Sequence, residues 1–408
     1  MATPADRFTA SFAELAAIGR DESSGGYRRL TWGEHDARAR DWFRAESLRI
    51  GLRDEVDRNG NLWAWWGDQP SDAVVSGSHL DTVVDGGAFD GALGVVAAFA
   101  AVEQLRESGR RPKRPLAVVA FIEEEGARFG VPTLGSRLMS GAIDPERVRG
   151  LVDRDGISFS SAMRSGGCDP DGMGVDAERL SRLGCFIELH IEQGRGLVDL
   201  DAPVGVISGV WPHGRWRLTL SGAADHAGTT LMEDRHDPMI VAAGAVTHAR
   251  RLSGAAGVRA TIGRIEANPN TTNTIAAATT VWLDARGPDE EAVRLFVETW
   301  VHAVEGDAAD HGVAVSCAEE SRSGGVSFDE TLGRTLAKAI ETTGGEATAM
   351  PTAAGHDAAI LAGHVPTAML HVRNATGTSH SPAEQAETPD CVRGVAVLAE
   401  ALGALACE

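Results

Sequence analysis

Four short apolar runs are each followed by a loop rich in glycine and polar residues: DAVVSGSH, PLAVVAFI, CFIELHI and VPTAMLHV. Runs of this length, rich in β-branched residues and bounded by turn residues, predict buried strands. Between the first two lies GALGVVAAFAAVEQLRESG, which predicts a helix of about five turns. Strands that alternate with helices indicate the α/β class, here a mixed, mostly parallel sheet covered by helices.

The chain between these runs follows a second pattern. RWRLTLSG, VRATIGRIEA, TTVWLDAR and VAVSCAEE predict strands, and two amphipathic stretches predict helices, the first with Asp237 as N-cap and Pro238 as first helical residue. The order βαββαβ is typical of the ferredoxin-like motif. We therefore predict a small domain of residues 213–322, inserted into a larger discontinuous domain of residues 1–212 and 323–408.

Composition and charge narrow the possible partners. The chain has 408 residues and a formal net charge of −20, from 38 basic and 58 acidic residues. This balance argues against nucleic acid or an anionic membrane as the main partner, because both require basic surfaces. No segment approaches the ~20 apolar residues of a membrane span, and the N-terminus lacks the apolar core of a secretory signal. Five widely spaced cysteines without a CxxC pair fit a reducing cytoplasm.

Imidazole and carboxylate side chains gather where the predicted strands end. They are His79, Asp81 and Asp90 after the first strand, Glu123, Glu124 and Glu125 after the second, His190, Glu192 and Gln193 at the third, and His380 after the fourth. In an open α/β sheet, functional groups collect at the carboxyl ends of the strands. A single histidine on an apolar strand is more often a core residue, but four strand ends that converge in this way indicate a site. Imidazole with carboxylate and no thiolate favours zinc, with manganese, cobalt or nickel as alternatives.

The longer motifs around these residues carry a family resemblance. GSHLDTVVDGGAFDGALGV, EEEGARFGVPTLGSR, ELHIEQG, DHAGTT and GTSHSPAE resemble the amidase, hydantoinase/carbamoylase family. That family includes N-carbamoyl-L-amino acid hydrolases, β-ureidopropionases and allantoate amidohydrolases, within the larger group of two-zinc aminoacylases and carboxypeptidases. The similarity covers nearly the whole chain, with the motifs in the order of the family.

The resemblance implies a centre with two divalent metal ions. By this resemblance, His79 and His190 would hold one ion, Glu125 and His380 would hold the other, and Asp90 would bridge them. Two ions held in this way lie about 3.5–4 Å apart.

The same resemblance assigns roles around the ligands. Asp81 would orient the imidazole of His79, and Glu124 would be the general base. Because adjacent residues of an extended chain point to opposite sides, the backbone must turn for Glu124 and Glu125 to serve one site, and Gly126 favours such a turn. Glu123 is then the spare carboxylate, which we expect to face solvent.

Substrate contacts are also implied by the resemblance. His226 would reach the active site of a partner subunit and stabilise an oxyanion, so the small domain would act as lid and dimerisation domain. Arg286 and Asn273 would hold a substrate carboxylate, the arginine through a bidentate contact, and Gln193 would contact the substrate from the larger domain. A supporting role falls to a further motif pair, His356 and Asp357.

The stretch before the small domain departs from part of the family. Allantoate-cleaving members carry a Gly-Gln-Arg-Arg-Tyr-like sequence where this chain has Pro212 to Trp216. His213 replaces the glutamine and Gly214 replaces one arginine, although His213 and Arg215 could supply equivalent donors. The motif FGVPTLGSR is closer to the branch that hydrolyses carbamoyl amino acids.

The sequence therefore predicts a cytoplasmic, homodimeric, metal-dependent amidohydrolase that acts on an N-carbamoyl-L-amino acid or a related ureido acid. Allantoate amidohydrolase is the alternative, followed by an aminoacylase or peptidase of the same group. A catalytically silent binding protein is disfavoured, because such proteins lose a ligand or the base and this chain has all of them.

Overall fold

The computed structural model describes residues 3–67 and 71–407. These form two compact units: unit 1 contains the described residues up to Gly209 and those from Ser327 onward, and unit 2 is Val210–Val326. The predicted insertion, residues 213–322, lies within unit 2. Within the described part of the chain, no helix is long and apolar enough to cross a membrane.

Unit 1 is built on a nine-stranded sheet with the order β1-β2-β4-β3-β5-β15-β6-β13, and β14 pairs with β6. The central strands β4, β3, β5 and β15 are parallel, and antiparallel pairs flank them. The four apolar runs in the sequence are these central strands, so the prediction of a mixed sheet covered by helices is confirmed, with the parallel pairs confined to these four strands. The strands are β1 (Arg53–Val56), β2 (Leu62–Trp66), β3 (Ala73–His79), β4 (Leu116–Phe121), β5 (Leu183–Ile191), β6 (Val204–Val210), β13 (Val326–Ser327), β14 (Ala349–Thr352) and β15 (Thr367–Val372).

Helices cover this sheet. Helix α3 (Ala92–Glu107) is the one predicted from the sequence, and it is apolar on nearly all sides because it lies between the sheet and helix α13 (Thr388–Ala406). Gly94 lets it approach closely, since a Cβ there would lie 2.2 Å from the carbonyl oxygen of Leu189 in β5. The other helices of unit 1 are α1 (Pro4–Ala16), α2 (Glu34–Arg49), α4 (Leu134–Ser140), α5 (Pro145–Arg149), α6 (Phe159–Ser165), α7 (Ala177–Arg182), α8 (Gly196–Asp199), α11 (Glu330–Thr342) and α12 (Asp357–Leu361), with a 3-10 turn at Pro170–Gly172.

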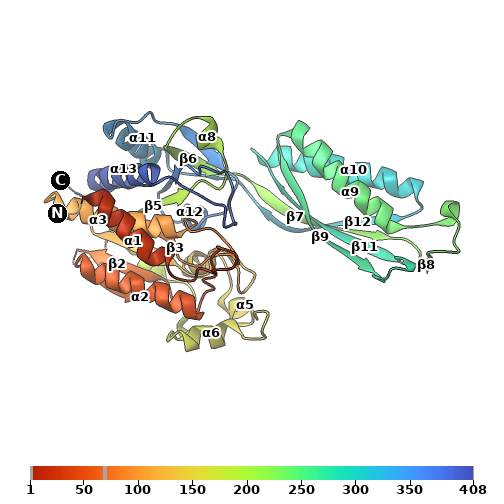
Figure 1. Cartoon of the computed structure of the whole chain (residues 1–408), viewed down its shortest axis with the longest axis horizontal. Coiled ribbons are helices and arrows are strands. Elements are labelled where there is room, and N and C mark those ends of the chain that lie inside the picture. The colour runs from red at the N-terminus through yellow and green to blue at the C-terminus, as the bar shows by residue number, and fades with distance from the viewer. Residues whose placement is uncertain (1–2, 68–70, 408) are drawn as a thin grey trace. The chain divides into compact units, whose positions relative to one another are not determined.

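Unit 2 contains an antiparallel sheet with the order β12-β7-β11-β9, and Figure 1 shows two helices along one of its faces. The strands are β7 (His213–Ser221), β9 (Arg259–Asn268), β11 (Ala278–Arg286) and β12 (Ala314–Ser323), and the helices are α9 (Pro238–Ala256) and α10 (Glu290–Asp310). The predicted βαββαβ order is confirmed. Asp237 is the N-cap of α9 and accepts a hydrogen bond from Met239 N.

Two further elements of unit 2 were not predicted. The strands β8 (Asp225–His226) and β10 (Thr274–Ile275) pair with each other, with His226 opposite Thr274. Both are only two residues long, and a 3-10 turn at Met232–Asp234 follows β8. Strands this short carry no hydrophobic periodicity, so the sequence gives no signal for them.

Candidate metal centre

The parallel strands of unit 1 deliver the candidate ligands to one edge of the sheet. His79 is the last residue of β3 and His190 lies near the end of β5. Asp90 precedes helix α3, Glu125 follows β4, and His380 lies in the loop between β15 and α13. The structure therefore brings together all five residues named as metal ligands.

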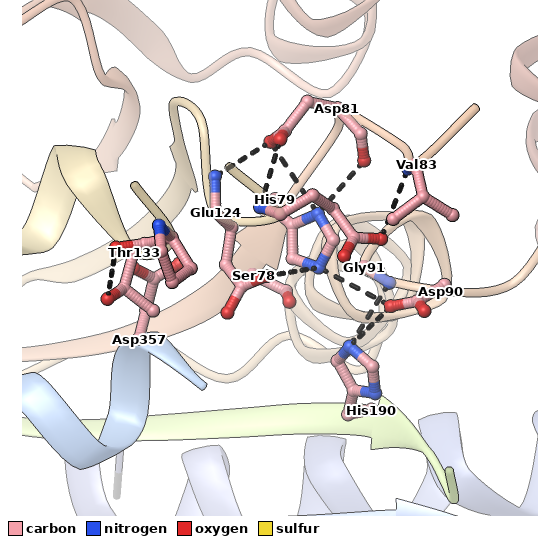
Figure 2. Close-up of polar contacts among 12 residues, drawn as sticks. Ser78, His79, Asp81, Val83, Asp90, Gly91, Glu124, Thr133, His190 and Asp357 are labelled. Atoms are coloured by element: carbon pink, nitrogen blue, oxygen red, sulfur yellow. Dashed lines mark hydrogen bonds and ion pairs between the residues drawn. The ribbon is translucent and has the colours of Figure 1, made fainter. Parts of the chain in front are cut away.

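The carboxylate of Asp90 is shared between two groups of side chains. Its Oδ1 lies 3.5 Å from His79 Nε2 and 3.1 Å from His190 Nε2. Its Oδ2 lies 3.4 Å from His380 Nε2, which in turn lies 3.3 Å from Glu125 Oε2. Figure 2 shows the imidazoles of His79 and His190 facing this carboxylate. We call the first group (His79, Asp90, His190) position 1 and the second (Asp90, Glu125, His380) position 2.

These two positions fit divalent ions. Ligand atoms about 2.0–2.2 Å from a tetrahedral ion lie about 3.3–3.6 Å apart, close to the separations above. In addition, His79 Nε2 and Asp90 Oδ1 are buried and have no hydrogen-bond partner among the described residues. Buried polar atoms normally have a partner, so these two atoms are available to a cation.

The protein fixes the tautomers of the two buried histidines. His79 Nδ1 lies 3.0 Å from the carbonyl oxygen of Asp81, and His190 Nδ1 lies 2.8 Å from that of Ile191. A carbonyl only accepts, so Nδ1 carries the proton in both rings. Nε2 of His79 then keeps a lone pair with no partner among the described residues, whereas Nε2 of His190 accepts the backbone N–H group of Gly91 at 3.2 Å. For His79 the partner is thus the carbonyl of Asp81, while the nearest oxygen of its carboxylate lies 3.7 Å away.

The carboxylate of Asp81 instead shapes the turn after β4. Its two oxygens accept the backbone N–H groups of Glu124 and Glu125, at 3.2 and 3.1 Å. The backbone reverses with φ of 49° at Glu123 and 65° at Gly126. This turn keeps Glu124 and Glu125 at one edge of the sheet, as the sequence requires if both serve the same site.

The expectation that Glu123 faces solvent is wrong. Its side chain is fully buried, and Oε1 accepts the backbone N–H groups of Arg128 at 3.0 Å and Phe129 at 2.7 Å. The unusual φ at Glu123 turns the side chain inward, where it satisfies amides that the turn would otherwise leave without partners. Burial, and next the negative charge of Asp81, raise the pKa of Glu123 to about 7.

Glu124 lies beside position 1. Its Oε2 is 3.6 Å from His79 Nε2, and Figure 2 shows both side chains. Burial raises the pKa of Glu124 well above its ordinary value, and the carboxylates of Asp357 and Glu125 raise it further. A buried carboxylate that binds a proton readily is suited to act as a general base and then as a general acid.

A glycine makes room for the first histidine. Gly91 has φ of 65°, and a Cβ there would lie 2.4 Å from two atoms of the His79 ring. Only glycine fits this backbone conformation and this close approach. Gly91, directly after Asp90, therefore leaves the space that the His79 ring occupies at position 1.

Two buried carboxylates at the centre were missed from the sequence. Glu188 accepts hydrogen bonds from Ser78 Oγ at 2.7 Å and from Ala358 N at 2.9 Å. Glu384 accepts the N–H groups of Phe89 and Asp90, both at 3.0 Å. Both lie inside quoted motifs, ELHIEQG and GTSHSPAE, which is the only sequence signal for them.

A further layer of buried groups lies behind position 1. The ring centroids of His190 and His356 are 4.6 Å apart, and Asp357 accepts a hydrogen bond from Ser136 Oγ. Burial lowers the pKa of His356 well below its ordinary value, and the neighbouring His190 lowers it further. His356 is therefore neutral, and the supporting role of His356 and Asp357 stays a prediction.

Gln193 and His226 were both predicted to contact the substrate or the reacting atoms. In unit 1, Gln193 Nε2 donates to Asp90 Oδ2 at 3.0 Å. In unit 2, His226 is exposed and its Nδ1 accepts the N–H groups of Gly228 at 3.0 Å and Thr229 at 3.2 Å. Nε2 of His226 therefore carries the proton and is a donor. Asn273 lies close to this histidine. The strands β8 and β10 pair, and Ala227 N, which follows His226, donates to the carbonyl oxygen of Asn273 at 3.1 Å.

The remaining predicted residues lie together on β7 and β11. Arg286 is opposite His213 and Asp284 is opposite Arg215. Arg286 donates through Nε and Nη2 to the two oxygens of Asp284, at 2.8 and 3.3 Å, and Arg215 Nε lies 3.4 Å from the same carboxylate. Burial alone would raise the pKa of Asp284, but the two arginines outweigh it and lower that pKa. Two of the three predicted side chains, Arg215 and Arg286, thus contact a carboxylate that was not predicted, and His213 lies opposite Arg286 in the strand pair.

This fold and centre define a class of metal-dependent hydrolases. Residues 72–404 match the model of Peptidase family M20/M25/M40, and the chain belongs to this family. It is 34% identical over 399 residues to N-carbamoyl-L-amino acid amidohydrolase of Geobacillus stearothermophilus, and the match covers 96% of each chain. It is 33% identical to allantoate amidohydrolase of Escherichia coli strain K12, again over 96% of each chain.

A solved structure agrees with these relatives. The hydantoinase/carbamoylase family amidase from Burkholderia ambifaria has a TM-score of 0.86 and 33% identity, over 99% of this chain and 98% of that one. The family resemblance predicted from the motifs is therefore confirmed. The chain is an amidohydrolase, an enzyme that hydrolyses C–N bonds.

Proposed function

We propose that the enzyme uses two divalent metal ions to hydrolyse the ureido or amide C–N bond of an N-carbamoyl-L-amino acid or a closely related ureido acid. The observation that carries this proposal is the Asp90 carboxylate, which is shared between positions 1 and 2 and has Glu124 beside it. The relative from Geobacillus stearothermophilus, named for N-carbamoyl-L-amino acids, supports the substrate class.

The proposed cofactor is a pair of zinc ions, with manganese, cobalt or nickel as alternatives. His79, Asp90 and His190 would hold one, and Asp90, Glu125 and His380 the other. When bound, such ions act as Lewis acids that lower the pKa of water toward ~7 and polarise a carbonyl group.

Glu124 would carry the proton through the reaction. It takes a proton from the attacking water, whose oxygen then forms a bond to the ureido or amide carbon. The tetrahedral intermediate collapses as the C–N bond breaks, and Glu124 returns the proton to the departing nitrogen. The position of Glu124 supports this role, because its Oε2 lies 3.6 Å from His79 Nε2 at position 1.

Unit 2 would supply the substrate contacts. In this proposal His226 donates from Nε2 to the developing oxyanion, because its Nδ1 is already used as an acceptor. Arg286 is the last residue of β11 and Asn273 lies before its first residue, about 26 Å of extended strand away. In this proposal the two side chains therefore hold the carboxylate of the substrate from different subunits, and Gln193 also contacts the substrate.

We also propose that the enzyme is a cytoplasmic homodimer that pairs through unit 2. The strands β9 and β12 are sheet edges, and unpaired edges favour association with another chain. Apolar side chains are exposed on the same unit, among them Leu231, Met232 and Ile240. The five cysteines are all free, in keeping with a reducing compartment.

Allantoate is the second candidate substrate. The relative from Escherichia coli strain K12, named allantoate amidohydrolase, is almost as similar as the first. Arg215 lies beside Arg286 on Asp284, so a second guanidinium is at hand for a larger ureido acid. His213 in place of a glutamine argues against it.

A substrate panel tests the proposal. Ammonia release from N-carbamoyl-L-amino acids and allantoate, and release of the free amino acid from N-acyl-amino acids, should be measured together with the metal content of the same preparation. We expect ammonia from ureido acids and metal at up to two ions per chain. Turnover of N-acyl-amino acids alone would replace the proposal with an aminoacylase.

A further inference from the structure

Glu384 ties two ligand-bearing loops to each other. It follows the candidate ligand His380 by four residues, in the loop between β15 and α13. Its Oε1 accepts the backbone N–H groups of Phe89 and Asp90, both at 3.0 Å, and its side chain is only 5% exposed. One buried carboxylate therefore connects the backbone of the bridging ligand to the loop that carries His380.

The loop before Asp90 is shaped to receive this carboxylate. A Cβ on Gly87 would lie 2.2 Å from Oε1 and 2.5 Å from Cδ of Glu384. The three atoms that such a Cβ would meet first all belong to Glu384. Gly87 and Glu384 are thus complementary, since the missing side chain of one provides the space for the other.

The two metal positions differ in how firmly their ligands are held. In position 1, His79 and His190 lie on the adjacent strands β3 and β5, and both are almost fully buried. In position 2, the side chain of His380 is 49% exposed, and its backbone has φ of 54° within a loop. Sheet pairing fixes the first pair of ligands, whereas His380 depends on the contacts of its loop.

We propose that Glu384 is a positioning residue that sets the separation of Asp90 and His380, and so holds position 2 more than position 1. The inference rests on the proposed two-metal function. Two hydrogen bonds to adjacent amides restrain the backbone of Asp90, and the short segment from His380 to Glu384 transmits that restraint to the imidazole. Groups that orient metal ligands in this way typically contribute 10–100-fold to metal affinity.

Zinc titration of the full-length enzyme against a competing chelator tests this inference. His380→Ala identifies which of the two zinc-binding steps belongs to position 2, because it abolishes that step. For Glu384→Ala we expect the zinc affinity of this step to fall by about 10–100-fold, and that of the other step to change by less than about threefold. Glu384→Gln retains an oxygen that can accept both amides, so it should bind both ions like the wild type. Glu387→Ala removes an exposed carboxylate from the same segment and is the matched control.

Gly87→Ala provides a second perturbation, because it displaces Glu384 without altering it. We expect the same loss of the position 2 ion, with far-ultraviolet circular dichroism unchanged. The inference is overturned if Glu384→Ala binds both ions as tightly as the wild type, if both steps weaken equally, or if Glu384→Gln is as damaged as Glu384→Ala. A wild type that binds fewer than two ions would instead overturn the proposed two-metal function.

Discussion

Replacement of Glu124 by glutamine separates proton transfer from metal binding. The side chain keeps its size, and Glu124 belongs to neither position 1 nor position 2. We therefore expect Glu124→Gln to keep the fold and the metal content of the wild type while losing nearly all turnover. An amide cannot take the proton of the attacking water.

The expected loss follows from the surroundings of Glu124. General acid–base catalysis contributes typically 10²–10⁴-fold, or about 2.7–5.5 kcal/mol. Each neighbouring carboxylate is committed elsewhere: Glu125 is a candidate ligand, Asp357 accepts from Ser136, and Glu123 accepts two backbone amides. Since none of them can replace the base, we expect the upper half of this range, a drop in kcat of about 10³–10⁴-fold.

The measurement is ammonia release from the best ureido acid, with metal content determined on the same samples. Glu123→Gln is the matched control, because glutamine can still accept the amides of Arg128 and Phe129. We expect it to keep its turnover. The reasoning is refuted if Glu124→Gln retains roughly a third or more of the wild-type kcat at full metal content, because loss of a general base lowers the rate by at least about 10²-fold.

Three further predictions concern the cofactor, the substrate and the subunits. Dialysis against a chelator should abolish activity, and zinc, manganese or cobalt should restore it; full activity in metal-free enzyme, checked by elemental analysis, would rule out the two-metal proposal. Arg286→Lys should weaken binding by roughly 1.5–3 kcal/mol, because an ammonium cannot make a bidentate contact, and an unchanged KM would show that Arg286 does not hold the substrate. If His226 acts on the partner subunit, mixing Glu124→Gln with His226→Ala subunits should restore up to about a quarter of wild-type activity, by statistical pairing in a two-fold dimer. Demonstrated subunit exchange without recovery would show that His226 does not act across the dimer.

The sequence predicts those elements whose hydrophobic pattern extends over many consecutive residues. The central strands β3, β5 and β15 are continuous apolar runs, because helices cover both faces of a parallel sheet. By contrast, the region from Leu134 to Arg182 consists of short helices in which no periodic pattern can develop. Helix α2 also escaped prediction, since its sequence EHDARARDWFRAESLR is largely polar and even its buried face includes the charged residues Asp36, Arg40 and Glu46.

For the metal centre, residue types and spacing predict the ligands but not the residues that hold them. Glu384 acts on backbone amides 294 and 295 residues away, and no local pattern encodes such a contact. Glu123 was misplaced because it had no role left once Glu124 and Glu125 were assigned, whereas the turn buries it against the backbone amides of Arg128 and Phe129. The carbonyl of Asp81, which orients His79, is a backbone group and has no sequence signal at all.

The position of β15 in the sheet has a consequence for biosynthesis. This strand lies between β5 and β6, although it follows both in the sequence, and the candidate ligands extend from His79 to His380 in a chain of 408 residues. A ribosome releases the chain from its N-terminus, so the facing edges of β5 and β6 stay open until residues Thr367–Val372 emerge. Open strand edges invite pairing with other chains. The sheet, and with it the full set of candidate ligands, therefore cannot be complete until residues near the end of the given sequence have been made.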